Sequence, residues 1–455
     1  MAGLSRRGIL LSASTAILAS PIAALARYVG LDIPRLMQGP MIGAAYKSGM
    51  TVWARASGPY SLRIEYATDP NFSQSMLTEA IGVNESDDFI AKMSITGLEA
   101  GSRYYYRVLL DDLPDKYQPG AYEFRTAPDP MYRFRLAFGS CARIHIDPNQ
   151  RIFEAVNGSN PDLFLWLGDN IYANSGLPSI IAEEYRRQRD VPSLQPLQRS
   201  IPQLAIWDDN DFGENDGGKS FAGKAASLKI FRQYWANPQF GLPAVPGVFF
   251  SYGYGGIDFF FLDGRYYRDD NTMPDGPDKS MLGLKQKDWL KETLMLSKAP
   301  FKVLVSGGGW STGKGPAGDG WSAFLTERNE IFDFIRDNDI QGVFCLSGDS
   351  HVGELNCIPR STVGGYDIYD FVSSPLAQPP SETYMEKTPE IRVRPVYFRG
   401  NNFGLLDFEP GADPTVTMTL RDTRGTSVWK PFRLRASDLV NDKTTWRDLA
   451  DVNEN

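Results

Sequence analysis

The stretch that decides the fold runs from Leu163 to Tyr172 and reads LFLWLGDNIY. Its apolar run ends abruptly at a glycine and an aspartate. A strand with one exposed face alternates polar and apolar residues, so this continuous run predicts a strand buried on both faces. The polar residues after it then lie at the strand's carboxyl end, where open α/β sheets bind their ligands.

Further stretches repeat this pattern of an apolar run followed by polar residues, most of them flanked by glycine. They are 134–138 before GSC, 204–207 before DDND, 257–262 before DGR, 301–305 before SGGGW and 343–346 before SGDSH. Between them, apolar residues recur at helical spacing, with Leu284, Trp289, Leu290 and Leu294 on one expected face and Ile331, Phe334 and Ile335 on another. Over residues 132–440 we therefore expect an α/β (α+β) sandwich of mixed sheets flanked by helices, with polar strand ends forming a site.

Residues 35–127 show a different pattern, which predicts a small all-β domain. The segments TVWAR (51–55) and LRIEY (62–66) alternate polar and apolar residues, as half-buried strands do. Residues 97–108, GLEAGSRYYYRV, resemble the turn and following strand of a fibronectin-type sandwich. Residues 127–130, APDP, mark a linker to the larger domain. We expect residues 441–455 to form a C-terminal tail.

Residues 1–26 have the features of a cleaved twin-arginine signal peptide. Arg6 and Arg7 precede a modest apolar run, and ALA stands directly before Arg27. The alternative is a membrane anchor, but the run is shorter than the ~20 residues that span a bilayer and contains serines and a proline. We therefore expect a periplasmic or secreted protein without an integral membrane segment after cleavage.

Composition restricts the kinds of site and partner. The formal net charge of −8 disfavours a nucleic-acid platform, because an acidic surface repels the phosphate backbone. An odd count of three cysteines is not a disulfide framework, although one Cys345–Cys357 bridge stays open. With only His145 and His351 available, a metal site must depend on Asp, Asn, Tyr and Cys. The oligomeric state is not defined by the sequence.

Three residues at strand ends have the chemistry of ferric iron ligands. The carboxylate of Asp169 can bridge two cations, and Tyr172 follows in the same turn. A tyrosine keeps its proton to pH ~10, so a phenolate ligand requires a strongly polarising cation. A thiolate from Cys141 would complete a set of ligands that suits ferric iron better than zinc.

Oxygen-rich segments predict a second cation beside the first. Asp349 and His351 are two residues apart, so in an extended strand end both side chains point to the same side and one can serve each metal. The segments 208–211 (DDND) and 215–216 (ND) crowd carboxylates that repel one another unless a cation binds, the alternative being a solvated acidic loop. Hard oxygen ligands favour Ca²⁺, Mg²⁺ or Mn²⁺. Arg265 follows a strand and is a candidate phosphate ligand, or else an ordinary ion pair.

Taken in order, these blocks resemble the PhoD-like (alkaline phosphatase D) metallophosphatases, which are related to purple acid phosphatases. The resemblance covers nearly all of the chain after the leader and implies Fe³⁺ beside Ca²⁺, with Mg²⁺, Mn²⁺ or Zn²⁺ as alternatives for the second ion. It implies that Cys141, Asp169, Tyr172 and His351 hold the iron, with Asp169 bridging. It further implies that Asp349, with Asp209 or Asn215, holds the second ion, and that Arg265 and Asn215 contact the substrate phosphate.

One position departs from the family pattern. The family commonly has WDDH where this chain has Trp207 to Asn210. In related enzymes that histidine lies near the leaving group, and an asparagine cannot act as an acid. Either Asp208, Asp211 or His145 supplies the proton, or the substrate has a good leaving group, or catalysis is altered.

These observations predict an exported metal-dependent phosphohydrolase that cleaves phosphomonoesters, phosphodiesters or both by two-metal activation of water. Its catalytic residues are expected to be Asp169, Asp209, Asn210, Arg265 and His351. The substrate is expected to be a small-molecule or lipid phosphoester. The alternatives are a phospholipase-type phosphodiesterase, a metal-retaining phosphate-ester-binding protein with weakened catalysis, and an adhesion or carbohydrate-binding module, which would leave the clustered carboxylates unexplained.

Overall fold

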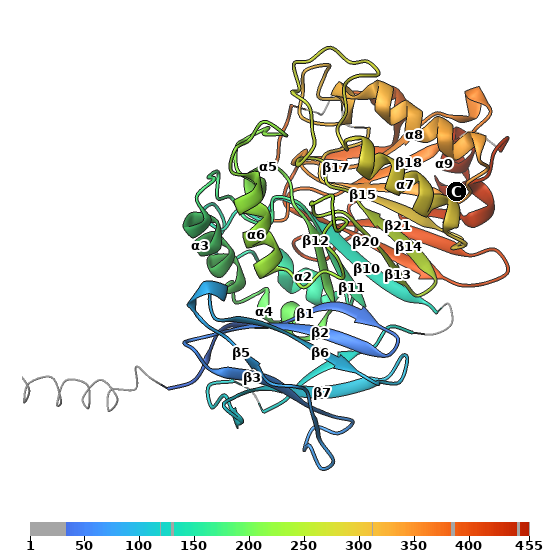
Figure 1. Ribbon diagram of the computed structural model, residues 1–455. Helices are drawn as coiled ribbons and strands as arrows, with labels where there is room; N and C mark the ends of the chain where they lie inside the picture. The colour runs from blue at the N-terminus through green and yellow to red at the C-terminus, as the bar shows by residue number, and fades with distance from the viewer. Residues whose placement is uncertain are drawn as a thin grey trace, which may run out of the picture.

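The computed structural model describes residues 33–118, 120–128, 132–311, 313–383, 387–443 and 446–454. An all-β domain comes first in the chain and packs under a larger α/β domain (Figure 1). The predicted leader, residues 1–26, lies outside the described residues. Within the part that is described, no helix combines the length and apolar character that crossing a membrane requires.

The N-terminal domain is a sandwich of two antiparallel sheets. One sheet consists of β1 (Leu36–Tyr46), β2 (Gly49–Ala56) and β6 (Ile90–Thr96). The other is centred on β3 (Ser61–Ala67) and β7 (Arg103–Leu110), with β4 (Met76–Leu77), β5 (Ile81–Gly82), β8 (Leu113–Pro114) and β9 (Tyr122–Arg125). The alternation in β3 places Leu62, Ile64 and Tyr66 inside the sandwich. This confirms the all-β domain that the sequence predicts.

The larger domain contains two mixed sheets. The first has the order β12-β11-β10-β20-β21-β22, formed by β10 (Phe134–Gly139), β11 (Leu163–Leu167), β12 (Gln203–Ile206), β20 (Asn402–Glu409), β21 (Thr415–Asp422) and β22 (Phe432–Arg435). The second has the order β13-β14-β15-β16-β18-β17-β19, formed by β13 (Phe250–Tyr254), β14 (Ile257–Phe261), β15 (Lys302–Ser306), β16 (Val343–Ser347), β17 (Gly353–Ile358), β18 (Ile368–Val372) and β19 (Arg392–Tyr397). Each sheet has a parallel part. It consists of β10, β11 and β12 in the first sheet and of β14, β15, β16 and β18 in the second.

Aromatic side chains fill the space between the two sheets. The ring of Phe138 meets that of Phe371 edge-on at 5.1 Å, and the ring of Phe259 meets that of Phe408 edge-on at 6.3 Å. Helices lie outside: α3 and α6 beside the first sheet, α7 and α8 beside the second (Figure 1). Because the central parallel strands β11, β12, β15 and β16 are buried along their whole length, their continuous apolar runs follow from the architecture. The helices are α2 (Ile152–Gly158), α3 (Pro178–Arg189), α4 (Gln195–Ser200), α5 (Asp209–Phe212), α6 (Lys224–Tyr234), α7 (Leu284–Leu296), α8 (Leu325–Asp337) and α9 (Trp446–Glu454).

Helices α7 and α8 form where the apolar spacing predicts them. Leu290 and Leu294 are buried in α7, as are Ile331 and Ile335 in α8. Leu284 was expected on the buried face, but this is wrong, because it is the first residue of α7 and is 66% exposed.

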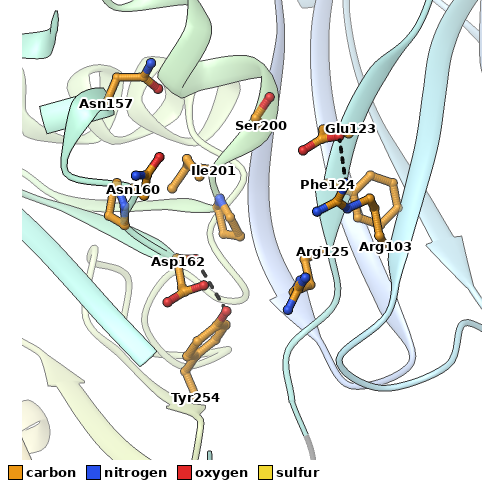
Figure 2. Close-up of a pocket in the computed structure, with 12 residues that line it drawn as sticks. Arg103, Glu123, Phe124, Arg125, Asn157, Asn160, Asp162, Ser200, Ile201 and Tyr254 are labelled. Atoms are coloured by element: carbon orange, nitrogen blue, oxygen red, sulfur yellow. Dashed lines mark hydrogen bonds and ion pairs between the residues drawn. The ribbon is translucent and has the colours of Figure 1, made fainter. Parts of the chain in front are cut away.

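The two domains share an interface built on aromatic residues. Trp53 of β2 donates through Nε1 to the carbonyl of Gln233 in α6, at 2.9 Å. The buried guanidinium of Arg189 lies 4.1 Å from the ring centroid of Trp235 and 5.7 Å from that of Trp53. Elsewhere along the interface lies a surface cleft of about 430 Å³ (Figure 2), with Arg103, Glu123 and Arg125 on one side and Asn157, Asn160, Asp162 and Tyr254 on the other.

Two features of the C-terminal half differ from simple expectation. The segment expected as a tail contains α9, which contacts β19 and β22, and the backbone N–H of Trp446 donates to Asp367 Oδ2 at 2.9 Å. The possible disulfide between Cys345 and Cys357 does not form, because both thiols are free. The two residues lie on β16 and β17, which are separated by β18.

The contact between β10 and β20 gives a stability prediction. A Cβ atom at Gly404 would overlap the ring of Phe138, which is itself fully buried. Overpacking a core typically costs ~1–3 kcal/mol, so Gly404→Ala should lower the free energy of unfolding by about that amount in urea titrations. Gly411→Ala is the matched control, because a Cβ there meets nothing within 4 Å. Equal stability of the two variants would contradict this packing.

Candidate metal centre

The candidate site lies where parallel strands end at one edge of the domain, and backbone bonds tie those ends together. The N–H of Cys141, after β10, donates to the carbonyl of Gly168, after β11, at 3.3 Å. After β16, the N–H of Asp349 donates to Ser140 Oγ at 3.1 Å. Residues about 200 positions apart in sequence are thereby fixed within one small volume.

Glycine is required where these turns approach one another most closely. A Cβ at Gly168 would lie 2.6 Å from Asp208 Cβ, and one at Gly348 would lie 2.6 Å from Ser140 Cβ. Real Cβ contacts are essentially never that short. The glycines beside the polar strand ends therefore serve close packing of the turns, and Gly168 also has a φ of +89°.

Four predicted ligands have a left-handed backbone conformation, which residues other than glycine seldom adopt. The φ values are +62° at Cys141, +51° at Asp169, +67° at Asp349 and +54° at His351. Residues in such sparsely populated regions cost free energy, persist only where the surroundings impose them, and cluster at functional sites. Their coincidence at one sheet edge makes this edge a candidate functional site.

The ligand set expected for the first metal comes together. Cys141 Sγ lies 3.6 Å from Asp169 Oδ2, and the Tyr172 hydroxyl lies 3.5 Å from His351 Nε2. One ligand atom from each of Cys141, Asp169 and His351 falls within 4.8 Å of the others. Thiol, carboxyl, phenol and imidazole groups from three strand ends thus surround one point.

Carboxylates adjoin this group in a chain of overlapping clusters. Asp169, Asp208 and Asp209 form one cluster, Asp208, Asp319 and Asp349 a second, and Asp209, Asp216 and Asp319 a third, each with its oxygens within 4.8 Å. Of the two alternatives for the second metal, Asp209 belongs to two clusters, and its Oδ2 accepts the N–H of Asp216 at 2.9 Å. Asn215 lines the same cavity but is exposed.

The cavity has a volume of about 290 Å³. Cys141 is fully buried beneath it. The predicted residues that line it are Asp169, Tyr172, Asp209, Asn210, Asn215, Asp349 and His351.

Burial disfavours the charged form of each of these groups, which for the acids is the form that binds cations. Burial, followed by the charge of Asp209, raises the pKa of Asp169 well above its usual value. Burial likewise raises the pKa of the Cys141 thiol and of the Tyr172 phenol, with Asp169 adding to both. The pKa of Asp349 is raised to about 6 by burial, against the opposing charge of Lys314. The pKa of His351 is lowered to about 4, first by burial and then by Lys314.

A bound cation would reverse the raised pKa values of these acids, because it stabilises carboxylate, thiolate and phenolate together. The lowered pKa of His351 already favours the neutral imidazole, which is the form that binds metals. An orphaned atom supports this: Oδ2 of Asp208 is buried and has no hydrogen-bond partner, although Oδ1 is paired with Arg265. Buried charges are normally paired or bind metals. The donor set therefore fits the expected metals, with soft and phenolic groups at one end and oxygen groups at the other.

Asn210 is directly bonded to the expected bridging ligand. Its side-chain Nδ2 donates to Asp169 Oδ2 at 2.8 Å and to Asp209 Oδ1 at 3.1 Å, and its backbone N–H donates to Asp169 Oδ1 at 3.2 Å. Asn210 therefore orients two carboxylates. It holds them as a neutral donor, where a histidine would titrate.

The acids considered as substitutes for a histidine at position 210 do not line the cavity. Asp208 pairs with Arg265, and Asp211 accepts hydrogen bonds from Asn170 and from the N–H of Asp208. His145 lies 2.8 Å from Glu184, with its side chain 46% exposed. The structure thus brings none of the three to the expected leaving-group position.

Arg265 lies behind the cavity and forms ion pairs, which was the alternative to a direct contact with phosphate. Its side chain is 1% exposed, with Nε 2.5 Å from Asp208 Oδ1 and Nη1 2.9 Å from Asp319 Oδ1. Arg268 pairs with the same Asp319 at 2.6 Å. These guanidinium groups neutralise the inner side of the acidic clusters, and Arg265 is not among the residues that line the cavity.

Sequence reasoning missed several residues of the site, among them Asn174, Ser350 and Ser381 of the cavity lining. Asp319 belongs to two carboxylate clusters, and Arg143, Lys314 and Gln378 line the cavity. Asp319 lies in the glycine-rich loop after β15, one of the strand ends that the sequence predicts to form the site. Had the search for polar residues continued to the end of that loop, it would have included Asp319. Arg143, Lys314 and Gln378 carry no local signal.

Comparisons with known proteins give consistent matches. The family model described as "PhoD-like phosphatase" matches residues 136–409, and that of the "PhoD-like phosphatase, N-terminal domain" matches residues 29–128. Alkaline phosphatase D of Bacillus subtilis (strain 168) is 22% identical over 306 residues, covering 56% of this chain and 52% of that protein. Purple acid phosphatase 23 of Arabidopsis thaliana is 25% identical over 230 residues, covering 47% and 46%. The chain thus spans about half the length of the curated relatives it matches.

Two solved structures share the fold. The structure of PhoD has a TM-score of 0.72 at 18% identity, covering 89% of this chain and 91% of that one. Purple acid phosphatase PPD1 from yellow lupin seeds has a TM-score of 0.62 at 12% identity, covering 91% and 75%. These matches confirm the fold expected from the sequence, which is a domain of mixed sheets flanked by helices preceded by an all-β domain.

The burial of Arg265 leads to a prediction about stability. Removing one partner of a buried ion pair typically costs ~3–5 kcal/mol, because the other charge is left uncompensated. Arg265→Met should therefore lower the free energy of unfolding severely, measured by chemical denaturation. The control is Arg187→Met: Arg187 pairs with Glu183 while 48% exposed, so its loss should cost at most ~1 kcal/mol. A stable Arg265→Met variant that has lost only phosphate affinity would instead support direct substrate contact.

Proposed function

Because the chain belongs to the PhoD-like phosphatase family, we propose that it is an exported metal-dependent phosphohydrolase acting on phosphate esters. The observation that carries the proposal is the meeting of Cys141, Asp169, Tyr172 and His351 beside a chain of carboxylates. Export rests on the twin-arginine pattern of residues 1–26.

Two cations fit the proposed ligand sets. Cys141, Asp169, Tyr172 and His351 would hold Fe³⁺, while Asp349 and Asp209, with Asp169 shared and Asn215 nearby, would hold Ca²⁺ or another divalent ion. When bound, such a metal pair supplies a water activated at moderate pH and positive charge for the phosphate oxygens.

The protein's own groups organise this chemistry. Asn210 holds Asp169 and Asp209 in fixed orientation through its amide donors. The buried pair of Arg265 and Arg268 with Asp319 fixes the rear of the acidic clusters. Carboxylates arranged in advance reorganise little during the reaction, which is how preorganised polar groups lower barriers.

The absence of an acid at position 210 limits the range of efficient substrates. General-acid assistance typically contributes ~10²–10⁴-fold. We propose that esters whose leaving group is already a good one, such as aryl esters, are cleaved far better than alkyl esters. A phosphate-ester-binding protein with little turnover is the second candidate, and the same Asn210 favours it.

Metal loading and turnover provide the main test. The purified protein should contain iron and a second divalent ion, and it should be coloured because tyrosinate bound to Fe³⁺ absorbs visible light. With Ca²⁺ present, it should hydrolyse p-nitrophenyl phosphate, its bis-ester, or both, and chelation should abolish this activity. A phospholipid assayed in parallel tests the phospholipase alternative.

Two results would change this assignment. Metal-loaded protein that binds aryl phosphates tightly without hydrolysing any ester would establish the binding-protein alternative. Protein that hydrolyses esters equally well after complete removal of metals would contradict the metal-dependent mechanism.

Asp169→Asn provides the sharpest test of the ligand assignment. Asparagine tolerates the left-handed backbone at this position, so the variant removes the charge with little strain. We expect metal content and kcat to fall together, by more than the ~10–100-fold typical of residues that only support a metal ligand. Asp278→Asn, at an exposed position away from the cavity, should retain both. Full activity with full metal content in Asp169→Asn would refute the assignment.

A further inference from the structure

Two basic side chains line a cavity that is otherwise rich in carboxylates. Asp169, Asp209, Asp216 and Asp349 contribute the acids, and Arg143 and Lys314 contribute the bases. Lys314 forms an ion pair with Asp349. The proposed function gives no role to Arg143, although it follows Cys141 by only two residues.

The backbone of Arg143 is held rigidly. Its N–H donates to the carbonyl of Ala377 at 2.9 Å, and its own carbonyl accepts the N–H groups of Ile146 and Asp147 at 3.1 Å each. The neighbouring Ala142 forms a parallel bridge with Ala377. The side chain thus starts from a fixed point at the end of β10.

The guanidinium of Arg143 is positioned over a proposed metal ligand. Its central carbon lies 5.2 Å from the ring centroid of Tyr172, a cation–π distance. Within the described residues, the side chain of Arg143 forms no hydrogen bond or ion pair, and it lines the cavity. Its guanidinium can therefore still bind an oxyanion in that cavity.

Arg143 differs from the other arginines near the site in its pairing. Arg265 and Arg268 are both neutralised by Asp319. Within the described ranges no carboxylate pairs with Arg143, and its Nε is buried without a hydrogen-bond partner. An unpaired buried donor costs free energy. An anion in the cavity would give this guanidinium the charged partner that it lacks.

We infer that Arg143 binds a non-bridging oxygen of the substrate phosphate and makes the site prefer dianionic phosphomonoesters to monoanionic diesters. The inference rests on the proposed function and extends it to the substrate class. A monoester carries nearly two negative charges above its second pKa of about 6, whereas a diester carries one. The fork of an arginine matches two oxygens of one phosphate.

The test compares two probes that differ in charge. Orthophosphate and dimethyl phosphate are titrated calorimetrically at pH 8 into metal-loaded wild type, Arg143→Met and Arg151→Met. Arg151 is an exposed arginine outside the cavity and serves as the matched control. A charged hydrogen bond is worth enough to weaken orthophosphate binding by about tenfold or more in Arg143→Met. We expect a smaller loss for dimethyl phosphate and no loss in Arg151→Met.

Kinetics give a second reading. In Arg143→Met the ratio of kcat/KM for p-nitrophenyl phosphate to that for its bis-ester should fall, mainly through a higher KM for the monoester. Arg143→Lys retains the charge without the fork and should bind orthophosphate with intermediate affinity. If the Met variant fails to fold, Arg143→Lys provides the test instead. A wild-type affinity for orthophosphate in Arg143→Lys would contradict binding through the paired N–H groups of the guanidinium.

The possible failures are distinguishable. If wild type contains both metals and hydrolyses esters, but Arg143→Met with the same metal content binds both probes as wild type does, only this inference is wrong. If both probes weaken equally, Arg143 contacts phosphate but does not select the monoester, and the substrate class is wrong. If wild type neither retains metals nor hydrolyses any ester, the proposed function fails, and this inference fails with it.

Discussion

The constraint on which the site depends is the burial of several carboxylates within a few ångströms of one another. Asp169, Asp208, Asp209, Asp319 and Asp349 share overlapping clusters, and all five are buried or nearly so. Such a group destabilises the fold unless positive charge is placed among it. The protein supplies part of that charge with Arg265 and Arg268 on the inner side. Cations bound on the cavity side would supply the rest.

This division of charge explains why arginines in one site play different parts. Arg265 is locked between Asp208 and Asp319, so it acts as part of the scaffold. Arg143 is fixed by its backbone yet has no acidic partner among the described residues, so its charge faces the cavity. The buried guanidinium groups that acids surround serve the structure, whereas the partly exposed Arg143 is the one proposed to serve recognition.

Asn210 links the scaffold to the chemistry. It bonds to Asp169 through both its backbone and its side chain, so its place in the turn after β12 fixes the orientation of the expected bridging carboxylate. The amide at this point supplies hydrogen-bond donors to both carboxylates but cannot act as an acid. An enzyme built in this way is expected to depend more on its metals and on the leaving group than on acid catalysis.

The sequence by itself determined the six strands of the larger domain that lead to polar ends, the helices α7 and α8, and many of the residue types at the site. Continuous apolar runs such as LFLWL occur where strands are buried on both faces, and polar residues after them lie at a sheet edge whatever the detailed packing. Cys141, Asp169, Tyr172, Asp349 and His351 were found in this way, and three of those side chains come together within 4.8 Å of one another. Tertiary structure alone decided which charges pair. The burial of Arg265, the position of Arg143 over Tyr172 and the separation of Cys345 from Cys357 depend on side chains brought together from distant segments, and no local pattern records such distances.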